Sequence, residues 1–310
     1  MPDERKHPPE LGEVVARLSA LLGPRHGNVQ QLSGGTTNRN FRVEFGGTDY
    51  VVRLPGRDTS KLGIDREAEC SANKRASELG IAPKVAAMIP DPPCLVTFFI
   101  HGRPAEPEEL TGPEGLVEVA TSLRAFHDSG ERLGTDFDSF RIVRDYAEIA
   151  EQHGVSLPDG YKSALSCAKA IAKATRGGEH EPVPCHNDLL AGNFLHDGDR
   201  LQIVDWEYAG MGDRYFDLAN FAINNELDER QQEGLIEAYF GERGPEPRLA
   251  ALRLMCFMSD FREAMWGVVQ SVASDLDFDF SDYAARHFER LGATAADPRF
   301  EGWLEAARGA

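Results

Sequence analysis

The chain has 310 residues, of which 41% are hydrophobic and 27% charged, and its formal net charge is −18. This length favours two lobes over a single core, and the composition is ordinary for a globular enzyme. The negative charge argues against the basic surface of a nucleic-acid-binding protein, and no apolar run is long enough to span a membrane.

The N-terminus and the cysteines both indicate the cytoplasm. Residues 1–10 are polar and lack the apolar core of a secretion signal. The five cysteines are scattered without the spacing of metal ligands, so we expect reduced and mostly buried thiols. The sequence leaves the choice between a monomer and a homodimer open.

The N-terminal third of the chain predicts a small β-sheet with two helices. Residues 10–22 place apolar side chains on one helical face before Gly23 and Pro24. A second helix follows Ile64 and ends near Gly80. Short apolar runs bounded by turn residues predict strands over 29–32, 40–45, 50–54, 85–88 and 94–99.

A turn between the first two strands and a charge in the third indicate a phosphate-binding site. The turn, SGGTTN, is rich in glycine and hydroxyl residues, so its backbone N–H groups can approach phosphate, although most such turns are only turns. Arg53 is the single charge in the strand YVVRL, where an inward charge is costly unless it is paired. An arginine fork can hold two phosphate oxygens. We expect nucleotide phosphates to meet Ser33, Gly34, Gly35, Thr36, Thr37, Asn38 and Arg53.

Past Gly102 the sequence becomes mainly helical, so we place the boundary there, between lobes of residues 1–101 and 102–310. An amphipathic helix is expected over 114–128, with His127 near its end as a structural residue. Further helices are expected over 140–153, 161–175, 247–254 and 255–274.

The stretch from residue 183 to 210, VPCHNDLLAGNFLHDGDRLQIVDWEYAG, is the most informative. Apolar runs on both sides of DGD predict a β-hairpin with buried strands. Asp188 and Asn193 precede the hairpin, five residues apart, and Asp205 closes it. This order matches the catalytic loop and the metal-binding aspartate of protein kinases. We therefore predict that Asp188 takes or orients the proton of an attacking hydroxyl, and that Asn193 and Asp205 bind Mg²⁺.

The alternative for these residues is structural: two turn residues and a cap at a strand end. All three residues, Asp188, Asn193 and Asp205, match the order of the protein-kinase motif, which makes the structural alternative the weaker one. HNDLLAGNFL followed by IVDWEYAG also resembles the choline/ethanolamine kinase family, within the larger aminoglycoside-phosphotransferase-like group. The resemblance covers nearly the whole chain and is strongest over 183–221 and 257–290. It implies an α+β, bilobal protein-kinase-like fold, with a small antiparallel sheet and a helix in the N-terminal lobe and a larger, mainly helical C-terminal lobe.

The resemblance also implies roles for residues outside the catalytic stretch. Arg53 would reach the phosphates while held by Glu69, with Glu67 as the other candidate partner. Backbone groups of residues 98–100 would meet adenine. Asp217, which the sequence alone predicts as a helix N-cap, would brace the catalytic loop from below, and His186 would give it structural support.

Residues 257–290 resemble the helices at the substrate end of choline kinases, where aromatic rings enclose a quaternary ammonium. Tyr208, Trp266 and Tyr283 stand at matching positions, and Glu207 is expected beside them. Animal members of the family have a second tryptophan where this chain has Glu263. That carboxylate could pair with an ammonium and favour a primary amine, or it could face solvent.

Together these features predict an enzyme that uses ATP and Mg²⁺ to phosphorylate the hydroxyl of a small cationic alcohol. Choline is the first candidate, and ethanolamine, an aminoglycoside or another alcohol are the alternatives. A catalytically inactive kinase-like binding module is the prediction from a different class. Neither nucleic acid nor membrane insertion is expected.

Overall fold

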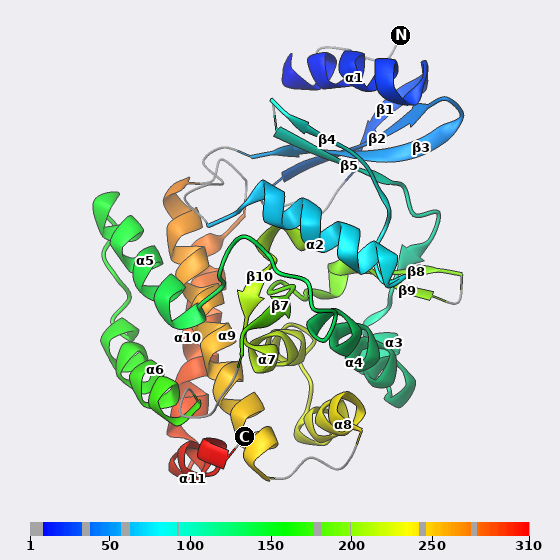
Figure 1. The fold of residues 1–310 in the computed structure, drawn as a ribbon. Helices are drawn as coiled ribbons and strands as arrows, with labels where there is room; N and C mark the ends of the chain where they lie inside the picture. The colour runs from blue at the N-terminus through cyan, green and yellow to red at the C-terminus, as the bar shows by residue number, and fades with distance from the viewer. Residues whose placement is uncertain are drawn as a thin grey trace.

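A five-stranded antiparallel sheet forms the upper lobe of the molecule in Figure 1, a computed structural model. The strand order is β1-β2-β3-β5-β4, and every neighbouring pair is antiparallel. The residues that the structure describes are 9–32, 38–56, 63–91, 93–175, 181–198, 200–241, 246–273 and 278–309. The strands are β1 (Arg25–Gln31), β2 (Asn38–Phe45), β3 (Thr48–Pro55), β4 (Val85–Pro90) and β5 (Pro93–Phe98).

Two helices cover the two faces of this sheet: α1 (Pro9–Leu22) lies above it and α2 (Arg66–Glu78) below it (Figure 1). The alternation of β3 puts Val52 and Leu54 into the apolar core that the sheet shares with α1. Successive strand residues point to opposite faces. Arg53 therefore points away from that core, toward α2 and the lower lobe.

The lower lobe is mainly helical and is organised around α9 (Glu246–Ala273), a helix of 28 residues. We predicted separate helical runs over 247–254 and 255–274. The structure joins them into one helix, because neither glycine nor proline stands near residues 254 and 255 to end it. The other helices of this lobe are α3 (Pro107–Thr111), α4 (Pro113–His127), α5 (Ser139–Gln152), α6 (Tyr161–Thr175), α7 (Arg214–Asn224), α8 (Glu229–Phe240), α10 (Phe280–Ala296) and α11 (Phe300–Ala306).

Short strands between the lobes carry the stretch from residue 183 to 212. The predicted hairpin is confirmed as β8 (Phe194–Asp197) and β9 (Arg200–Ile203), which pair antiparallel and extend β6 (Arg103–Pro104). A second pair joins β7 (Val183–Cys185) to β10 (Gly210–Gly212). The hairpin is fixed from inside by buried Phe194 and Ile203, which lie opposite one another.

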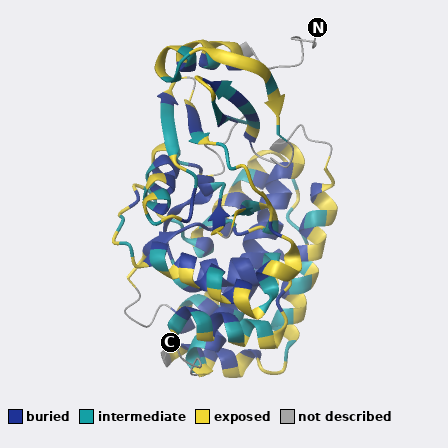
Figure 2. Ribbon diagram, turned by 90° about the vertical axis from the view of Figure 1, so that its right-hand side faces the viewer, coloured by how far each residue is buried: buried dark blue, intermediate teal, exposed yellow. Residues whose placement is uncertain are grey.

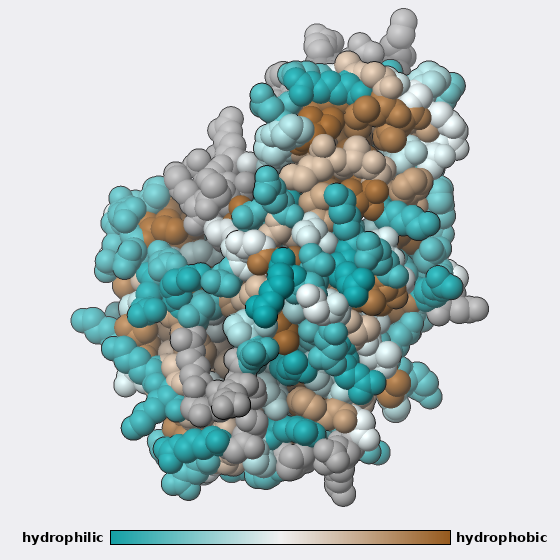
Figure 3. Space-filling model, in the orientation of Figure 1, coloured by the Kyte–Doolittle hydropathy of each residue, from teal (hydrophilic) through white to brown (hydrophobic). Residues whose placement is uncertain are grey.

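Burial follows the same division (Figure 2): buried residues fill the centre of the helical lobe, and exposed ones lie on its outer helix faces. Hydrophilic side chains cover much of the lower lobe on the face drawn in Figure 3. Within the described ranges, no helix is both long and apolar enough to cross a membrane. The cysteines are free, as predicted, and all but the partly buried Cys167 are buried.

Candidate active site

The loop between β7 and β8 is held from below by one carboxylate. Asp217 of α7, fully buried, accepts hydrogen bonds from the backbone N–H groups of His186 (2.8 Å) and Asn187 (2.6 Å). Its other partner is His127 of α4, whose Nε2 lies 3.0 Å away. The prediction that Asp217 caps the helix is wrong, since the N-cap of α7 is Asp213 and Asp217 lies one turn further on. Its side chain instead faces the loop.

The His186 side chain holds the backbone of Asp188 in place. Its Nδ1 accepts a hydrogen bond from the backbone N–H of Asp188 (3.2 Å), so its Nε2 carries the proton and donates to the carbonyl of Val204 (3.0 Å). Burial lowers the pKa of this imidazole. A neutral histidine thus ties the catalytic loop to the end of β9. Asn193 closes the loop, because its Nδ2 donates to the carbonyl of Asp188 at 2.8 Å.

One cavity gathers all the residues predicted for catalysis, for metal binding and for substrate binding. Its volume is about 120 Å³, and it lies between the catalytic loop, β9, α9 and α10. Burial raises the pKa of Asp188 within it, and the nearby Arg262 opposes that shift. The lining residues are Asp188, Leu190, Asn193, Asp205, Glu207, Tyr208, Arg262, Glu263, Trp266, Phe278 and Tyr283.

Charged pairs join the upper lobe to one end of this cavity. Arg53 of β3 pairs with Asp205 at 2.5 Å and with Glu69 of α2 at 2.9 Å, so Glu69 and not the exposed Glu67 is its partner on α2. Asp205 has a left-handed backbone (φ 67°, ψ 59°), which is strained for a residue with a side chain and marks a position held by its surroundings. Its carboxylate is thereby aimed between the lobes.

Glu207 is the centre of a second set of contacts between the lobes. Its Oε2 accepts from Asn38 Nδ2 at 2.7 Å and lies 3.3 Å from Arg66 Nη1. Burial and the neighbouring Asp205 raise the pKa of Glu207 to about 7. Arg66 also reaches Glu69 (2.7 Å). Sequence reasoning missed Arg66, whose only local signal is a basic residue at the start of a helix. The predicted residues Ser33, Gly34, Gly35, Thr36 and Thr37 lie outside the described residues.

Oxygen donors at this end of the cavity suit a hard cation. Asp205 offers a carboxylate, and Asn193 donates from its amide nitrogen to the loop, so its amide oxygen is the atom that could bind a cation. Carboxylate and amide oxygens are the ligands that Mg²⁺ takes in proteins. The two residues therefore fit the predicted metal.

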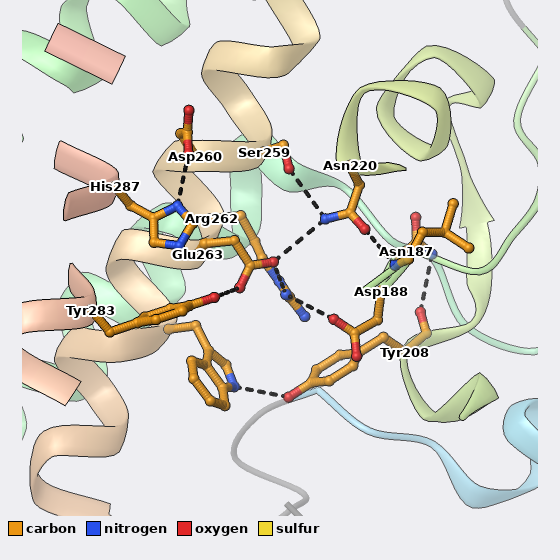
Figure 4. Close-up of polar contacts among 12 residues, drawn as sticks. Asn187, Asp188, Tyr208, Asn220, Ser259, Asp260, Arg262, Glu263, Tyr283 and His287 are labelled. Atoms are coloured by element: carbon orange, nitrogen blue, oxygen red, sulfur yellow. Dashed lines mark hydrogen bonds and ion pairs between the residues drawn. The ribbon is translucent and has the colours of Figure 1, made fainter. Parts of the chain in front are cut away.

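The other end of the cavity is aromatic and carries one carboxylate (Figure 4). Trp266 donates from Nε1 to the Tyr208 hydroxyl at 3.0 Å, and the Trp266 and Tyr283 rings meet edge to face with centroids 5.7 Å apart. The Tyr283 hydroxyl donates to Glu263 Oε2 at 2.8 Å. Glu263 is only 3% exposed, which rules out the alternative that it faces solvent.

Arg262 is the residue of the cavity that sequence reasoning missed. Its guanidinium is buried, pairs with Glu263 at 2.5 Å and lies 3.7 Å from Asp188. It also stacks over the Tyr208 ring, 4.4 Å from the centroid. The motif FREAMW does contain this arginine, but neighbouring residues on a helix rarely face the same partner. Only the folded structure shows that Arg262 and Glu263 both line the cavity.

Comparison with known proteins shows which protein family this chain belongs to. The model of the phosphotransferase enzyme family, APH, matches residues 28–253. A choline/ethanolamine kinase family protein from Mesorhizobium loti has 30% sequence identity and a TM-score of 0.82, covering 97% of this chain and 99% of that one. The choline kinase LicA from Streptococcus pneumoniae, at 23% identity, shares the fold with a TM-score of 0.78 over 93% of this chain and 99% of its own.

Two curated relatives agree with these matches. Protein LicA of Haemophilus influenzae is 25% identical over 265 residues, 83% of this chain and 76% of that protein. Ethanolamine kinase 2 of Rattus norvegicus is 27% identical over 309 residues, 89% of this chain and 78% of that protein.

The chain therefore belongs to the phosphotransferase enzyme family, and it is an enzyme that transfers phosphate to an alcohol. Within that family its predicted membership of the choline/ethanolamine kinases is confirmed, as is the bilobal kinase-like fold. The roles assigned to individual site residues stay predictions.

Proposed function

We propose that this chain transfers the γ-phosphate of ATP, in the presence of Mg²⁺, to the hydroxyl of a small amino-alcohol. The observation that carries the proposal is the cavity itself. Its lining brings together Asp188, the oxygen donors Asn193 and Asp205, and an end with the Glu263 carboxylate and the rings of Tyr208, Trp266 and Tyr283. The first side suits metal and phosphate, and the second suits an ammonium.

Asp188 would orient the acceptor hydroxyl and take its proton. The hydroxyl oxygen forms a bond to the γ-phosphorus, the bond from that phosphorus to the β–γ bridging oxygen breaks, and ADP leaves. The loop contacts of His186 and Asn193 keep the Asp188 backbone in place for this role. When bound between Asn193 and Asp205, Mg²⁺ would neutralise charge on the phosphates.

Arg53 would meet the phosphates from the upper lobe. Its guanidinium is aimed by Glu69 on one side and Asp205 on the other. A guanidinium that carboxylates already hold in place loses little side-chain entropy when it binds phosphate, which favours binding. Backbone groups of residues 98–100 would receive the adenine. Among solved relatives of the fold, LicA is known in complex with AMP, and the aminoglycoside phosphotransferase APH(4)-Ia in a ternary complex with ADP and hygromycin B.

The amine would lie at the end formed by Glu263, Trp266 and Tyr283. Choline and ethanolamine are the simplest amino-alcohols, and the relatives carry their names. The aromatic faces support choline, and the buried carboxylate supports a primary amine that can donate hydrogen bonds. A cavity of about 120 Å³ favours either over an aminoglycoside, because drug-sized ligands occupy pockets of several hundred cubic ångströms.

Product analysis tests the proposal. The protein is incubated with ATP, Mg²⁺ and a panel of amino-alcohols, and each acceptor is examined by mass spectrometry for the gain of one phosphoryl group. Asp188→Asn is the control, since it keeps the side-chain shape and cannot take the proton. A phosphorylated amine acceptor in the wild type only supports the proposal. Phosphoryl transfer confined to alcohols without an amine would refute it.

A further inference from the structure

The cation that lies over the Tyr208 ring in this structure is the protein's own. Arg262 Cζ is 4.4 Å from that ring's centroid, and the residue is 1% exposed. A quaternary ammonium is held by the faces of several aromatic rings. Here one of the three predicted faces is already taken by a guanidinium that cannot lose its charge.

The carboxylate predicted to replace the second tryptophan is also engaged. Glu263 Oε1 pairs with Arg262 at 2.5 Å, and Glu263 Oε2 accepts from Tyr283 at 2.8 Å. An ammonium brought to this end would gain attraction from Glu263 and meet repulsion from Arg262 at a similar distance. Arg262 thus offsets part of the attraction that Glu263 exerts on an ammonium. A ligand that is only a cation offers Arg262 no new partner.

Arg262 has donor capacity that the described residues do not use. Its Nε and Nη2 are buried and have no hydrogen-bond partner among them. A buried charged donor without a partner costs free energy. The guanidinium fork matches the two oxygens of a carboxylate. By turning its planar head in place, Arg262 could offer that unpaired edge to a ligand in the cavity that it lines.

We propose that the acceptor is a zwitterionic alcohol, a small molecule with an ammonium and a carboxylate beside its hydroxyl. Its carboxylate pairs with Arg262 and its ammonium with Glu263. The internal ion pair is then exchanged for two pairs with the ligand, so neither buried charge is left uncompensated. Asp188, 3.7 Å from Arg262, is close enough to receive the hydroxyl of the same small molecule. This inference rests on the proposed function and narrows its acceptor class.

Three acceptors that share one hydroxymethyl group isolate the two charges. L-serine carries both charges, ethanolamine lacks the carboxylate, and 3-hydroxypropionate lacks the ammonium. Initial rates are measured with ATP and Mg²⁺, with choline as a fourth acceptor. We expect kcat/KM for L-serine to exceed that for each of the others by at least ~10-fold, since each partial ligand leaves one buried charge unpaired. Equal or higher values for ethanolamine or choline would overturn the inference while leaving the proposed function intact.

Matched variants assign the effect to Arg262. Arg262→Met alone leaves Glu263 buried without its partner and risks the fold. The double variant Arg262→Met/Glu263→Gln removes both charges together, and Arg262→Lys keeps the charge without the fork. We expect the double variant to reduce the ratio of kcat/KM for L-serine to that for choline by on the order of 100-fold, and the lysine variant to reduce it by less. An equal loss for both acceptors would show a structural role only and would contradict the inference.

Binding without turnover separates the two proposals. Titration calorimetry of the wild-type chain with L-serine, ethanolamine and 3-hydroxypropionate requires no nucleotide. Tighter binding of L-serine than of both others supports the zwitterion site even if no phosphate is transferred, in which case the proposed function fails and the binding site remains. Binding of L-serine no tighter than of ethanolamine overturns the site.

Discussion

At the scale of single residues, the site is a set of carboxylates kept apart by three arginines. Arg53 lies between Glu69 and Asp205, Arg66 touches Glu69 and Glu207, and Arg262 lies between Glu263 and Asp188. Each buried acid thus has a cation within reach, which is the condition for burying charge without losing the fold. Asp188 has the loosest of these contacts, at 3.7 Å, and is the one left to face a hydroxyl.

Replacing Asp188 by asparagine should lower kcat by about 10²–10⁴-fold, the range expected for loss of a general base. The KM for ATP should change little, because the phosphate contacts assigned to Arg53 remain. Steady-state rates measure both constants, and circular dichroism checks the fold. Wild-type turnover in this variant would remove Asp188 from the mechanism.

His186 should make stability depend on pH. Its pKa is lowered in the folded chain from the ordinary 6.5, because burial disfavours the imidazolium. The unfolded chain therefore binds the proton first as pH falls. The stability from this group is complete above pH 6.5 and is lost as pH drops below it.

The comparison is the free energy of unfolding of the wild type and His186→Gln at about pH 8 and about pH 5. We expect the wild type to lose more stability between the two conditions than the variant does. Parallel losses would mean that His186 is protonated as easily in the folded chain as in the unfolded one.

At the scale of elements, the acceptor end depends on how closely α10 packs on α9. Gly267 of α9 sits against α10: an added Cβ would lie 3.1 Å from Phe280 O, 3.1 Å from the Tyr283 ring and 3.2 Å from Ala284. Glycine there lets the two helices approach, and their approach brings Tyr283 to Glu263.

Gly267→Val should push α10 outward and raise the acceptor KM by about 10-fold, with the KM for ATP unchanged, because a misplaced partner costs ~1.4 kcal/mol or more. Gly292→Ala on α10 is the control, since nothing lies within 4 Å of its added Cβ and alanine favours a helix. Equal KM values in both variants would show that the helix spacing does not shape the site.

The elements also show what could be predicted and what could not. The hairpin from Phe194 to Ile203 was predictable because apolar runs and turn residues are local signals. The prediction divided α9 at residues 254 and 255, although neither glycine nor proline stands near that point. The position of Arg262 could not be predicted, because it depends on which distant segment packs against its helix. For Asp217, helical position alone predicted a cap, and only the family resemblance indicated its contact with the catalytic loop. Helical periodicity predicts which face of a helix a residue lies on, but not which residue of another segment it contacts.

At the scale of the whole molecule, side chains of the upper lobe complete the site in the lower one. Arg53 reaches Asp205, and Asn38 and Arg66 reach Glu207, so the lobes meet through charged and polar contacts at the cavity. A phosphate and a divalent ion entering between Arg53 and Asp205 would replace that pair with two new ones. Nucleotide binding should therefore tighten the contact between lobes.

Adding ADP and Mg²⁺ at about 100 times the dissociation constant should stabilise the chain by ~2.7 kcal/mol, a rise in Tm of about 5 °C. Removing Mg²⁺ with a chelator should abolish most of that rise and all turnover. Asp205→Ala should behave as the chelated wild type does, since it lacks a ligand for the ion. A rise in Tm that is independent of Mg²⁺ and of Asp205 would contradict the metal assignment.

The central claim is phosphate transfer from ATP to an amino-alcohol at Asp188. The most direct measurement is ADP release, coupled to a spectrophotometric reaction, with ATP and Mg²⁺ and with choline, ethanolamine, L-serine and an aminoglycoside each at equal concentration. We expect release with at least one of the small amino-alcohols choline, ethanolamine and L-serine, and we expect that release to be lost in Asp188→Asn. Release with the aminoglycoside alone, or release at the wild-type rate in Asp188→Asn, would contradict it.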